Sequence, residues 1–459
     1  MSTTRVASAA DAGATSVPSI PAPTPPAASP AAYPLALPRL APVAPAPGQR
    51  LALPPLAGSA DALAIAEFAT RKKAERGTVA VFAADAQSAQ RLVDEIAWFA
   101  PALGIAPFPD WETLPYDHFS PHQDLVSQRL ATLYRLARGE FDVVVVSAST
   151  ALYRLAPASY LAARTFFLTQ GTKLDVDALR AQLALAGYTH VTQVVAPGEF
   201  SVRGGLIDLF ATGSTLPYRL DLFGDEIESI RTFDVDSQRT LYPVRDVRLL
   251  PAREFPLDDE GRARFRSRFR EAFEGDPSKT GIYRDVSNGV APGGIEYWLP
   301  LFFDATATFA DYLPPHTSVV LQGDVAGAVD QFWRDTDARY RLLRGERGRP
   351  LLPPTQMFVP VDAFYAGLKP FARLELSPAA AVTPDTSPTP PVDAAATTMA
   401  APGAIPTRPL PSLTVDRRAA DPLAALKAFI ARSTERVAIC ADSAGRRETM
   451  QQFFAEYGV

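Results

Sequence analysis

The sequence predicts an α/β protein that carries a smaller α+β segment in its middle. The run Phe141–Ala148 (FDVVVVSA) is almost wholly apolar and β-branched, as is typical of a strand buried on both faces of a parallel sheet. Other apolar runs, each followed by a helix-like segment, lie before and after the middle of the chain, and this alternation is typical of βαβ units. Between about 160 and 250, short strands separated by glycine turns indicate antiparallel hairpins instead.

Two strand–helix units flank the middle segment. Thr78–Ala83 (TVAVFA) is expected to be a strand, and Asp85 can cap the helix that follows it. The apolar side of that helix is expected to comprise Ala89, Leu92, Val93, Ile96 and Ala97. Beyond the middle segment, Ser318–Gln322 (SVVLQ) predicts a strand that precedes a helix over Ala326–Leu343.

The middle segment is predicted to begin with a helix. Asp175 is expected to cap this helix, Val176–Ala186 to form it and Gly187 to close it. Short strands should follow, with turns at Gly204-Gly205 and Gly224-Asp225. The expected strands are Val191–Val195, Phe200–Val202, Leu206–Phe210, Tyr218–Phe223 and Ile227–Asp234.

One more unit is predicted near the end of the sequence. Glu435–Ala441 (ERVAICA) is expected to be a buried strand, with Cys440 in its core, and Ser443–Tyr457 a helix. A further strand should follow this helix. We therefore expect the last unit to be incomplete and the chain to be a truncated piece of a longer protein.

Proline is the unusual feature of the composition. Half of the 44 prolines lie in 1–55 and 376–413, and this Pro- and Ala-rich composition predicts disorder. The whole pattern divides the sequence into five segments. They are a disordered tail over 1–49, a first part of the α/β domain over 50–160, an inserted α+β domain over 161–249, a second part of the α/β domain over 250–354, and a small incomplete α/β domain over 355–459 with a disordered insertion at 376–413.

Composition excludes several classes of protein. The 47% hydrophobic and 21% charged residues are ordinary for a globular protein, and the net charge of -5 argues against a basic nucleic-acid coat. A single cysteine excludes a disulfide framework, and four scattered histidines do not suggest a metal centre. The sequence shows neither a long apolar run nor a secretory signal, so we expect no membrane partner and a cytoplasmic location.

No motif for nucleotide chemistry stands out in the sequence. A phosphate-binding loop needs a Gly-Lys pair before Ser or Thr, and no such pair occurs. Gly275–Thr280 (GDPSKT) has the wrong spacing and is expected to be a surface loop. Leu56–Asp61 (LAGSAD) precedes a helix but lacks lysine, and Asp61 would repel phosphate. The sequence therefore predicts a chain that is not a catalyst by itself and holds no cofactor.

Surface residues of the inserted domain are candidates for a binding site. Arg203 lies beside two glycines, whereas Arg219 and Phe223 project from the same face of one strand. Exposed arginines beside an aromatic are typical of a protein-binding hot spot, and the acidic balance of residues 170–250 argues against nucleic acid here. The alternative is that Phe223 lies in the core and the arginines form local ion pairs. The acids available for such pairs are Asp208, Asp221 and Glu226.

A basic stripe follows the inserted domain. Phe265 and Phe269 are expected to anchor a helix that carries Arg262, Arg264, Arg266, Arg268 and Arg270. Candidates for contact with DNA or with a neighbouring domain are Arg262, Arg266 and Arg270. A solvated helix face is the default interpretation of this stripe.

Five segments of the sequence resemble the N-terminal part of the bacterial transcription-repair coupling factors. They are Pro109–Leu136, Gly198–Phe210, Leu216–Thr240, Gly294–Phe303 and Arg349–Pro354. The resemblance extends over about 50–375 and resumes over about 415–459. It implies a RecA-like domain of the UvrB type that binds no ATP, is split by the inserted domain, and is followed by a small α/β domain.

The resemblance also implies partners. In this family the inserted domain docks the excision-repair protein UvrA, and Arg203, Arg219 and Phe223 fall on positions implicated in that contact. The parts that bind RNA polymerase and translocate along double-stranded DNA, with their ATP and Mg, are expected beyond this chain. The implied function is recruitment of UvrA to lesions where RNA polymerase has stalled. The alternative is a DNA-dependent ATPase or helicase-like subunit that binds damaged DNA.

Overall fold

The computed structural model describes residues 44–53, 56–346, 348–376, 413–415, 418–434 and 437–459. The chain divides into two compact units, Met1–Pro406 and Thr407–Val459. Residues 1–43 of the predicted tail 1–49 lie outside the described residues. The predicted insertion 376–413 lies outside them except for its two end residues.

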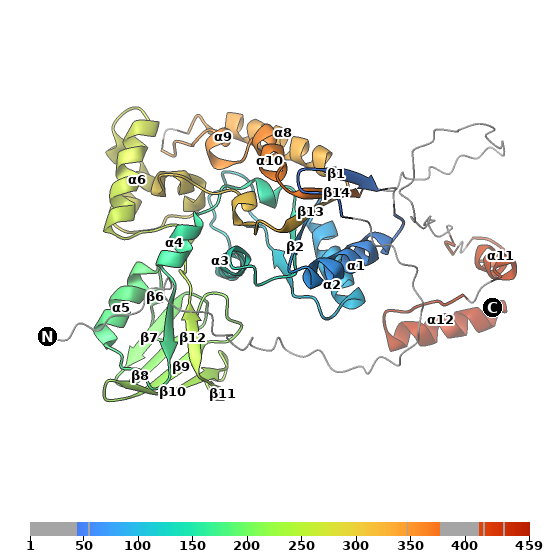
Figure 1. Cartoon of the computed structure of the whole chain (residues 1–459), viewed down its shortest axis with the longest axis horizontal. Coiled ribbons are helices and arrows are strands. Elements are labelled where there is room, and N and C mark those ends of the chain that lie inside the picture. Colours follow the sequence, from blue (N-terminus) through green and yellow to red (C-terminus); the bar gives the residue numbers. More distant parts are fainter. Residues whose placement is uncertain (1–43, 54–55, 347, 377–412, 416–417, 435–436) are drawn as a thin grey trace. The chain divides into compact units, whose positions relative to one another are not determined.

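A six-stranded parallel sheet forms the centre of the first unit (Figure 1). Its order is β1-β14-β13-β2-β4-β3, and every neighbouring pair is parallel. The strands are β1 (Arg50–Leu53), β2 (Thr78–Ala83), β3 (Ile105–Phe108), β4 (Val143–Ser147), β13 (Thr317–Gln322) and β14 (Ala372–Leu376). All residues of β2 and β4 are buried, so the predicted parallel sheet with a fully buried central strand is confirmed.

Helices cover both faces of this sheet. One face packs on α1 (Ala60–Ala74) and α2 (Ala86–Phe99) through alternate residues of β2 and β4. The other face packs on α3 (Gln123–Ala137), α8 (Val325–Leu343) and α10 (Val361–Leu368). The remaining helices of the unit are α4 (Ala158–Ala163), α5 (Val176–Leu185), α6 (Asp259–Ala272), α7 (Gly281–Ser287) and α9 (Pro354–Met357).

The cap predicted for α2 is confirmed. The Asp85 side chain accepts a hydrogen bond from the Ser88 amide at 2.7 Å, which satisfies one of the free amides at the helix start. Of the predicted apolar side, Leu92 and Ile96 are buried, but Ala97 is exposed. None of the helices within the described residues is long and apolar enough to cross a membrane.

The central sheet takes strands from both sides of the middle segment. Strand β14 pairs with β13 and β1, in register Val320↔Leu374 and Leu51↔Leu374. Residues 372–376 therefore belong to the large parallel sheet, whereas the sequence placed the end of this domain at 354. Strands β1 and β14 have only four and five residues, so they give little local signal, and their pairing joins residues more than 300 positions apart in the chain.

The middle segment forms a second six-stranded sheet, in the order β11-β10-β9-β8-β7-β6. The strands are β6 (Thr189–His190), β7 (Glu199–Arg203), β8 (Leu206–Leu209), β9 (Tyr218–Phe223), β10 (Glu226–Phe233) and β11 (Thr240–Val244). They are antiparallel except for β6 and β7. Helix α5, capped by Asp175 as predicted, packs one face of this sheet through Leu179 and Leu183. The segment enters and leaves through the antiparallel pair β5 (Phe166–Thr169) and β12 (Asp246–Leu249).

The strand predicted over Val191–Val195 does not form. Strand β6 ends at His190, and the amides of Val195 and Ala196 donate to the Glu199 carboxylate at 2.8 and 2.9 Å. Side-chain bonds therefore replace ladder bonds here. Val194 packs instead with Phe210 and Phe233 on the face of the sheet opposite α5.

The second unit contains α11 (Ala424–Arg432) and α12 (Ala444–Tyr457). The predicted helix Ser443–Tyr457 is confirmed as α12, and the Ser443 hydroxyl caps it by accepting from the Arg446 amide at 3.2 Å. The predicted strand Glu435–Ala441 is wrong for its described residues 437–441, and Cys440 is exposed rather than in a core. No other described residue of this unit is in a strand, so the apolar run has no partner with which to form a ladder.

Candidate partner-binding site

The face of the second sheet opposite α5 carries the predicted site residues. Tyr218, Leu220 and Leu222 point towards α5, so alternation along β9 turns Arg219 and Phe223 to the other face. Strand register sets Asp208 of β8 directly across from Arg219. We call this surface the outer face of the inserted sheet. The structure thus brings the two residues of β9 together on one surface, as the sequence predicted.

Asp208 is the centre of an ion-pair cluster on the outer face. Its side chain is only 1% exposed and accepts from both arginines. Arg203 donates through Nη2 at 2.5 Å, and Arg219 donates through Nε and Nη2 at 2.7 and 3.0 Å. The hydrogen bond to Asp208 raises the pKa of Arg219, because it stabilises the charged guanidinium. Local pairing of the arginines, the alternative from the sequence, is therefore confirmed for Asp208.

The two arginines differ in how much of the guanidinium a partner could reach. The Arg219 side chain is 15% exposed. It also donates to the Gln238 carbonyl at 3.0 Å, and its guanidinium lies 4.7 Å from the centre of the Phe233 ring. The Arg203 side chain is 52% exposed and uses one nitrogen for Asp208. Arg203 thus presents most of its donors to solvent, whereas Arg219 is held within the sheet by Asp208 and Gln238.

Phe223 lies at the end of β9 and is 79% exposed. The alternative that it is a core residue is wrong. The chain turns sharply after it, and Gly224 adopts a positive φ of 65° that a residue with a side chain would rarely take. A large aromatic held in solvent on the same face of a sheet as two arginines has the composition of a protein-binding hot spot.

The basic stripe on α6 is mostly occupied by local partners. Phe265 and Phe269 are buried, which confirms the predicted anchors of this helix. Arg262 pairs with Asp259, and Arg270 donates to the Tyr283 hydroxyl at 3.2 Å. Arg264 and Arg268 both contact Asp304. Among the described residues no ion pair involves Arg266, and its contact with DNA or another domain stays a prediction.

A buried carboxylate lies at the start of α1, in the segment Leu56–Asp61, which precedes a helix as a phosphate-binding loop does but lacks its lysine. Asp61 is buried at the start of α1. It accepts from Arg91 at 3.1 and 2.7 Å, from Gln322 at 2.9 Å and from the Ala62 amide at 2.7 Å. The Arg91, Gln322 and Ala62 donors that could bind an anion here thus already bind the Asp61 carboxylate. Within the described residues no group of three or more His, Cys, Asp or Glu could hold a metal ion.

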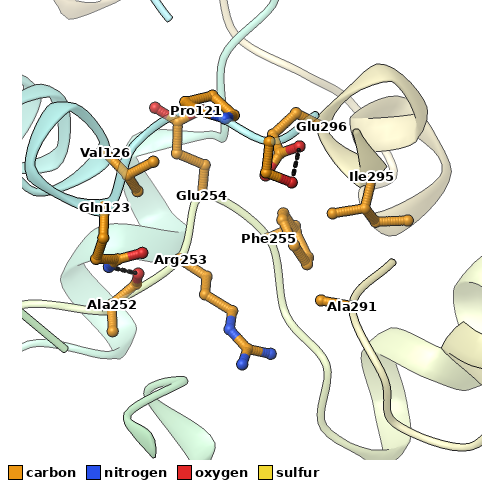
Figure 2. Close-up of a pocket in the computed structure, with 11 residues that line it drawn as sticks. Pro121, Gln123, Val126, Ala252, Arg253, Glu254, Phe255, Ala291, Ile295 and Glu296 are labelled. Atoms are coloured by element: carbon orange, nitrogen blue, oxygen red, sulfur yellow. Dashed lines mark hydrogen bonds between the residues drawn. The ribbon is translucent and has the colours of Figure 1, made fainter. Parts of the chain in front are cut away.

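A cavity of about 140 Å³ lies where the chain leaves the inserted segment (Figure 2). The start of α3, the stretch 252–255 and the 3-10 helix Ile295–Phe302 line it. Gln123 donates to the Ala252 carbonyl at 2.9 Å, and Ser120 donates to Glu296 at 2.8 Å. The cavity therefore sits in a hydrogen-bonded junction at the base of the inserted segment.

The buried carboxyl of Glu296 should make stability fall with rising pH. Burial raises the pKa of Glu296 to about 7, so the folded chain holds this proton more tightly than the unfolded chain. The free energy of unfolding should then decrease between about pH 4.5 and 7, by up to about 3 kcal/mol, and stay low above that. Glu296→Gln should be more stable than the unmodified chain at pH 8 but not at pH 5.

The measurement is the urea midpoint of both proteins at these two pH values. Glu228→Gln, on the exposed side of the inserted sheet, is the matched control and should show the parent's pH dependence. An equal pH dependence for Glu296→Gln and the parent would contradict the assignment to Glu296.

Two family models match the chain. One, described as the UvrB interaction domain, matches residues 166–255 and so contains the whole inserted sheet with its outer face. The other, described as the MFD D3 domain, matches residues 429–459 in the second unit. The inserted sheet is therefore an interaction domain of the UvrB type, carried on a parallel α/β domain.

Curated relatives extend this similarity over most of the chain. The chain is 42% identical to the transcription-repair-coupling factor of Escherichia coli over 409 residues. This aligned region covers 89% of this chain and 34% of the Escherichia coli protein. It is 39% identical to the factor of Haemophilus influenzae, and the aligned region covers 85% of this chain and 32% of that protein. It is 32% identical to the factor of Myxococcus xanthus, and that aligned region covers 72% of this chain and 28% of that protein. The chain thus spans about a third of the length of these relatives. It belongs to the family of transcription-repair-coupling factors, as its motifs predicted.

Proposed function

We propose that this chain is the recruiting part of a transcription-coupled repair factor and that the outer face of the inserted sheet binds UvrA. The observation that carries the proposal is the cluster of Arg203, Asp208 and Arg219 on the same face of the sheet as the exposed ring of Phe223. The UvrB interaction model, which covers this sheet, and the names of the relatives support it. Contacts with RNA polymerase and DNA, and ATP-driven translocation, are assigned to the part of those relatives that this chain does not match.

The geometry suits a protein partner with carboxylates around an apolar pocket. Asp208 fixes one edge of Arg203 and leaves the rest of its guanidinium to solvent, so little side-chain freedom is lost when a partner binds. A guanidinium can pair with a carboxylate through two parallel hydrogen bonds. Phe223 would supply the apolar anchor that such an interface needs.

Binding of purified UvrA to the full chain tests this proposal. Arg203→Ala should weaken the affinity about tenfold or more, because it removes a guanidinium that the fold only partly uses. Arg180→Ala is the matched control, since Arg180 lies on α5 at the opposite side of the sheet. Isothermal titration calorimetry measures all three proteins.

Each result has a defined meaning. Affinity lost in Arg203→Ala and kept in Arg180→Ala would support docking on the outer face. An unmodified chain that does not bind UvrA would remove the proposed function. Equal affinities for all three proteins would place the site elsewhere on the chain.

A further inference from the structure

Arg231 lies on the outer face next to the proposed contact residues. It is exposed on β10, and the strand register places it directly across from Arg219 of β9. Pro243 of the edge strand β11 lies opposite it on its other side. Directly opposed residues in an antiparallel pair project from the same face, with Cβ atoms about 5 Å apart. Arg231 therefore extends the row formed by Asp208 and Arg219.

The charge of Arg231 is not balanced by any described residue of the chain. Arg203 and Arg219 share the single carboxylate of Asp208. Asp221, which lies two residues further along β9 on the same face, accepts from the Ser229 hydroxyl at 3.0 Å. In the part of the chain that the structure describes, no ion pair or hydrogen bond engages the guanidinium of Arg231.

The position is unfavourable for folding. Like charges directly opposite each other in a sheet destabilise it, and Asp208 is bonded to Arg219 rather than to Arg231. Residues that violate a local folding rule without compensation are expected at functional sites. A partner that places a carboxylate beside Arg231 would supply the missing compensation.

We propose that Arg231 is a further contact residue of the outer face and pairs with a carboxylate of the docking protein. The inference rests on the proposed function and adds the chemistry of the partner, namely an acidic surface that faces β9 and β10. Because Arg231 is exposed, its charge acts mainly on the rate of association and on the salt dependence of binding.

Charge reversal at this position separates a binding role from a structural one. Arg231→Glu should slow association with UvrA about tenfold or more at low salt, and the difference from the parent should shrink as salt rises. The same variant should unfold at an equal or higher temperature, since the new carboxylate faces Arg219. Arg231→Lys should keep most of the association rate, because it keeps the charge. Arg180→Glu, on the α5 side of the sheet, controls for the change in net charge.

The outcomes distinguish this inference from the proposed function. Slower association for Arg231→Glu but not for Arg180→Glu, together with an undiminished unfolding temperature, would support the inference. Unchanged association for Arg231→Glu, while Phe223→Ala binds weakly, would overturn it and leave the proposed function in place. A parent chain that fails to bind UvrA would overturn both.

Discussion

Replacing Phe223 by alanine should weaken the binding of UvrA about thirtyfold or more and leave the thermal midpoint of the chain unchanged. The ring is 79% exposed and lies outside the core clusters of the sheet, so truncation leaves no cavity. Aromatic anchors of this kind carry about 2 kcal/mol or more of an interface. Affinity and stability should therefore separate cleanly in this variant.

The matched control for Phe223→Ala is an aromatic residue exposed elsewhere. Trp98 on α2 is 74% exposed, and Trp98→Ala should bind UvrA like the parent. Calorimetric titration gives the affinities, and differential scanning calorimetry gives the midpoints. The prediction fails if Phe223→Ala binds within about twofold of the parent, or if it binds weakly only because its midpoint has dropped.

Local patterns predicted the centre of the parallel sheet but not its edges. Strands β2 and β4 are buried throughout and read as continuous apolar runs, which is the signal of a central strand. Strand β1 has four residues that alternate between exposed and half-buried, and β3 contains Pro107. Such strands can be identified only from the strand with which they pair. Arg50 of β1 pairs with Arg373 of β14, which is far away in the sequence.

The alternation of side chains along β9 was enough to locate the candidate site, but its ion pairs depend on the register between neighbouring strands. The spacing of Arg219 and Phe223 is enough to put both side chains on one face of a strand, whichever strands lie beside it. The sharing of Asp208 by two arginines, and the place of Arg231 across from Arg219, depend on how β8, β9 and β10 align. A sequence does not specify that alignment locally, since β10 also contains an irregularity between Ile227 and Ser229.

Side-chain hydrogen bonds account for another difference. The run 191–195 (VTQVV) is rich in β-branched residues, as strands are, yet the Glu199 carboxylate accepts hydrogen bonds from the amides of Val195 and Ala196. A carboxylate three or four residues away in the sequence competes with the ladder for these donors. Hydrophobic periodicity contains no information on that competition.

A buried ion pair at the base of the inserted segment should dominate the stability of the first unit. Arg129 of α3 is fully buried and donates through Nε to Glu254 at 2.7 Å. Glu254 also accepts from the Trp111 indole at 3.1 Å, and Arg129 donates to the Pro109 carbonyl at 2.8 Å. The Arg129 guanidinium lies 4.4 Å from the centre of the Phe108 ring. The pair thus ties the segment that leaves the inserted sheet to the central domain.

Removing one partner of this pair should be far more costly than removing both. Glu254→Ala leaves the guanidinium of Arg129 buried without a counter-charge, and Arg129 already has one nitrogen, Nη2, without a hydrogen-bond partner in the structure. The expected loss is about 3–5 kcal/mol. The double variant Arg129→Met, Glu254→Leu fills a similar volume with apolar groups and should lose clearly less than either single change.

Urea unfolding followed by tryptophan fluorescence measures these differences, because Trp111 contacts the pair directly. Lys173→Ala is the control, because Lys173 forms a surface ion pair with Asp225 in which both side chains are mostly exposed. This variant should barely change the urea midpoint. A double variant as unstable as Glu254→Ala would show that packing, rather than an unpaired charge, sets the loss. If the pair serves only to hold the junction, Glu254→Ala should still bind UvrA below its unfolding midpoint, because the inserted sheet has its own core around Ile207 and Leu220, between the sheet and α5.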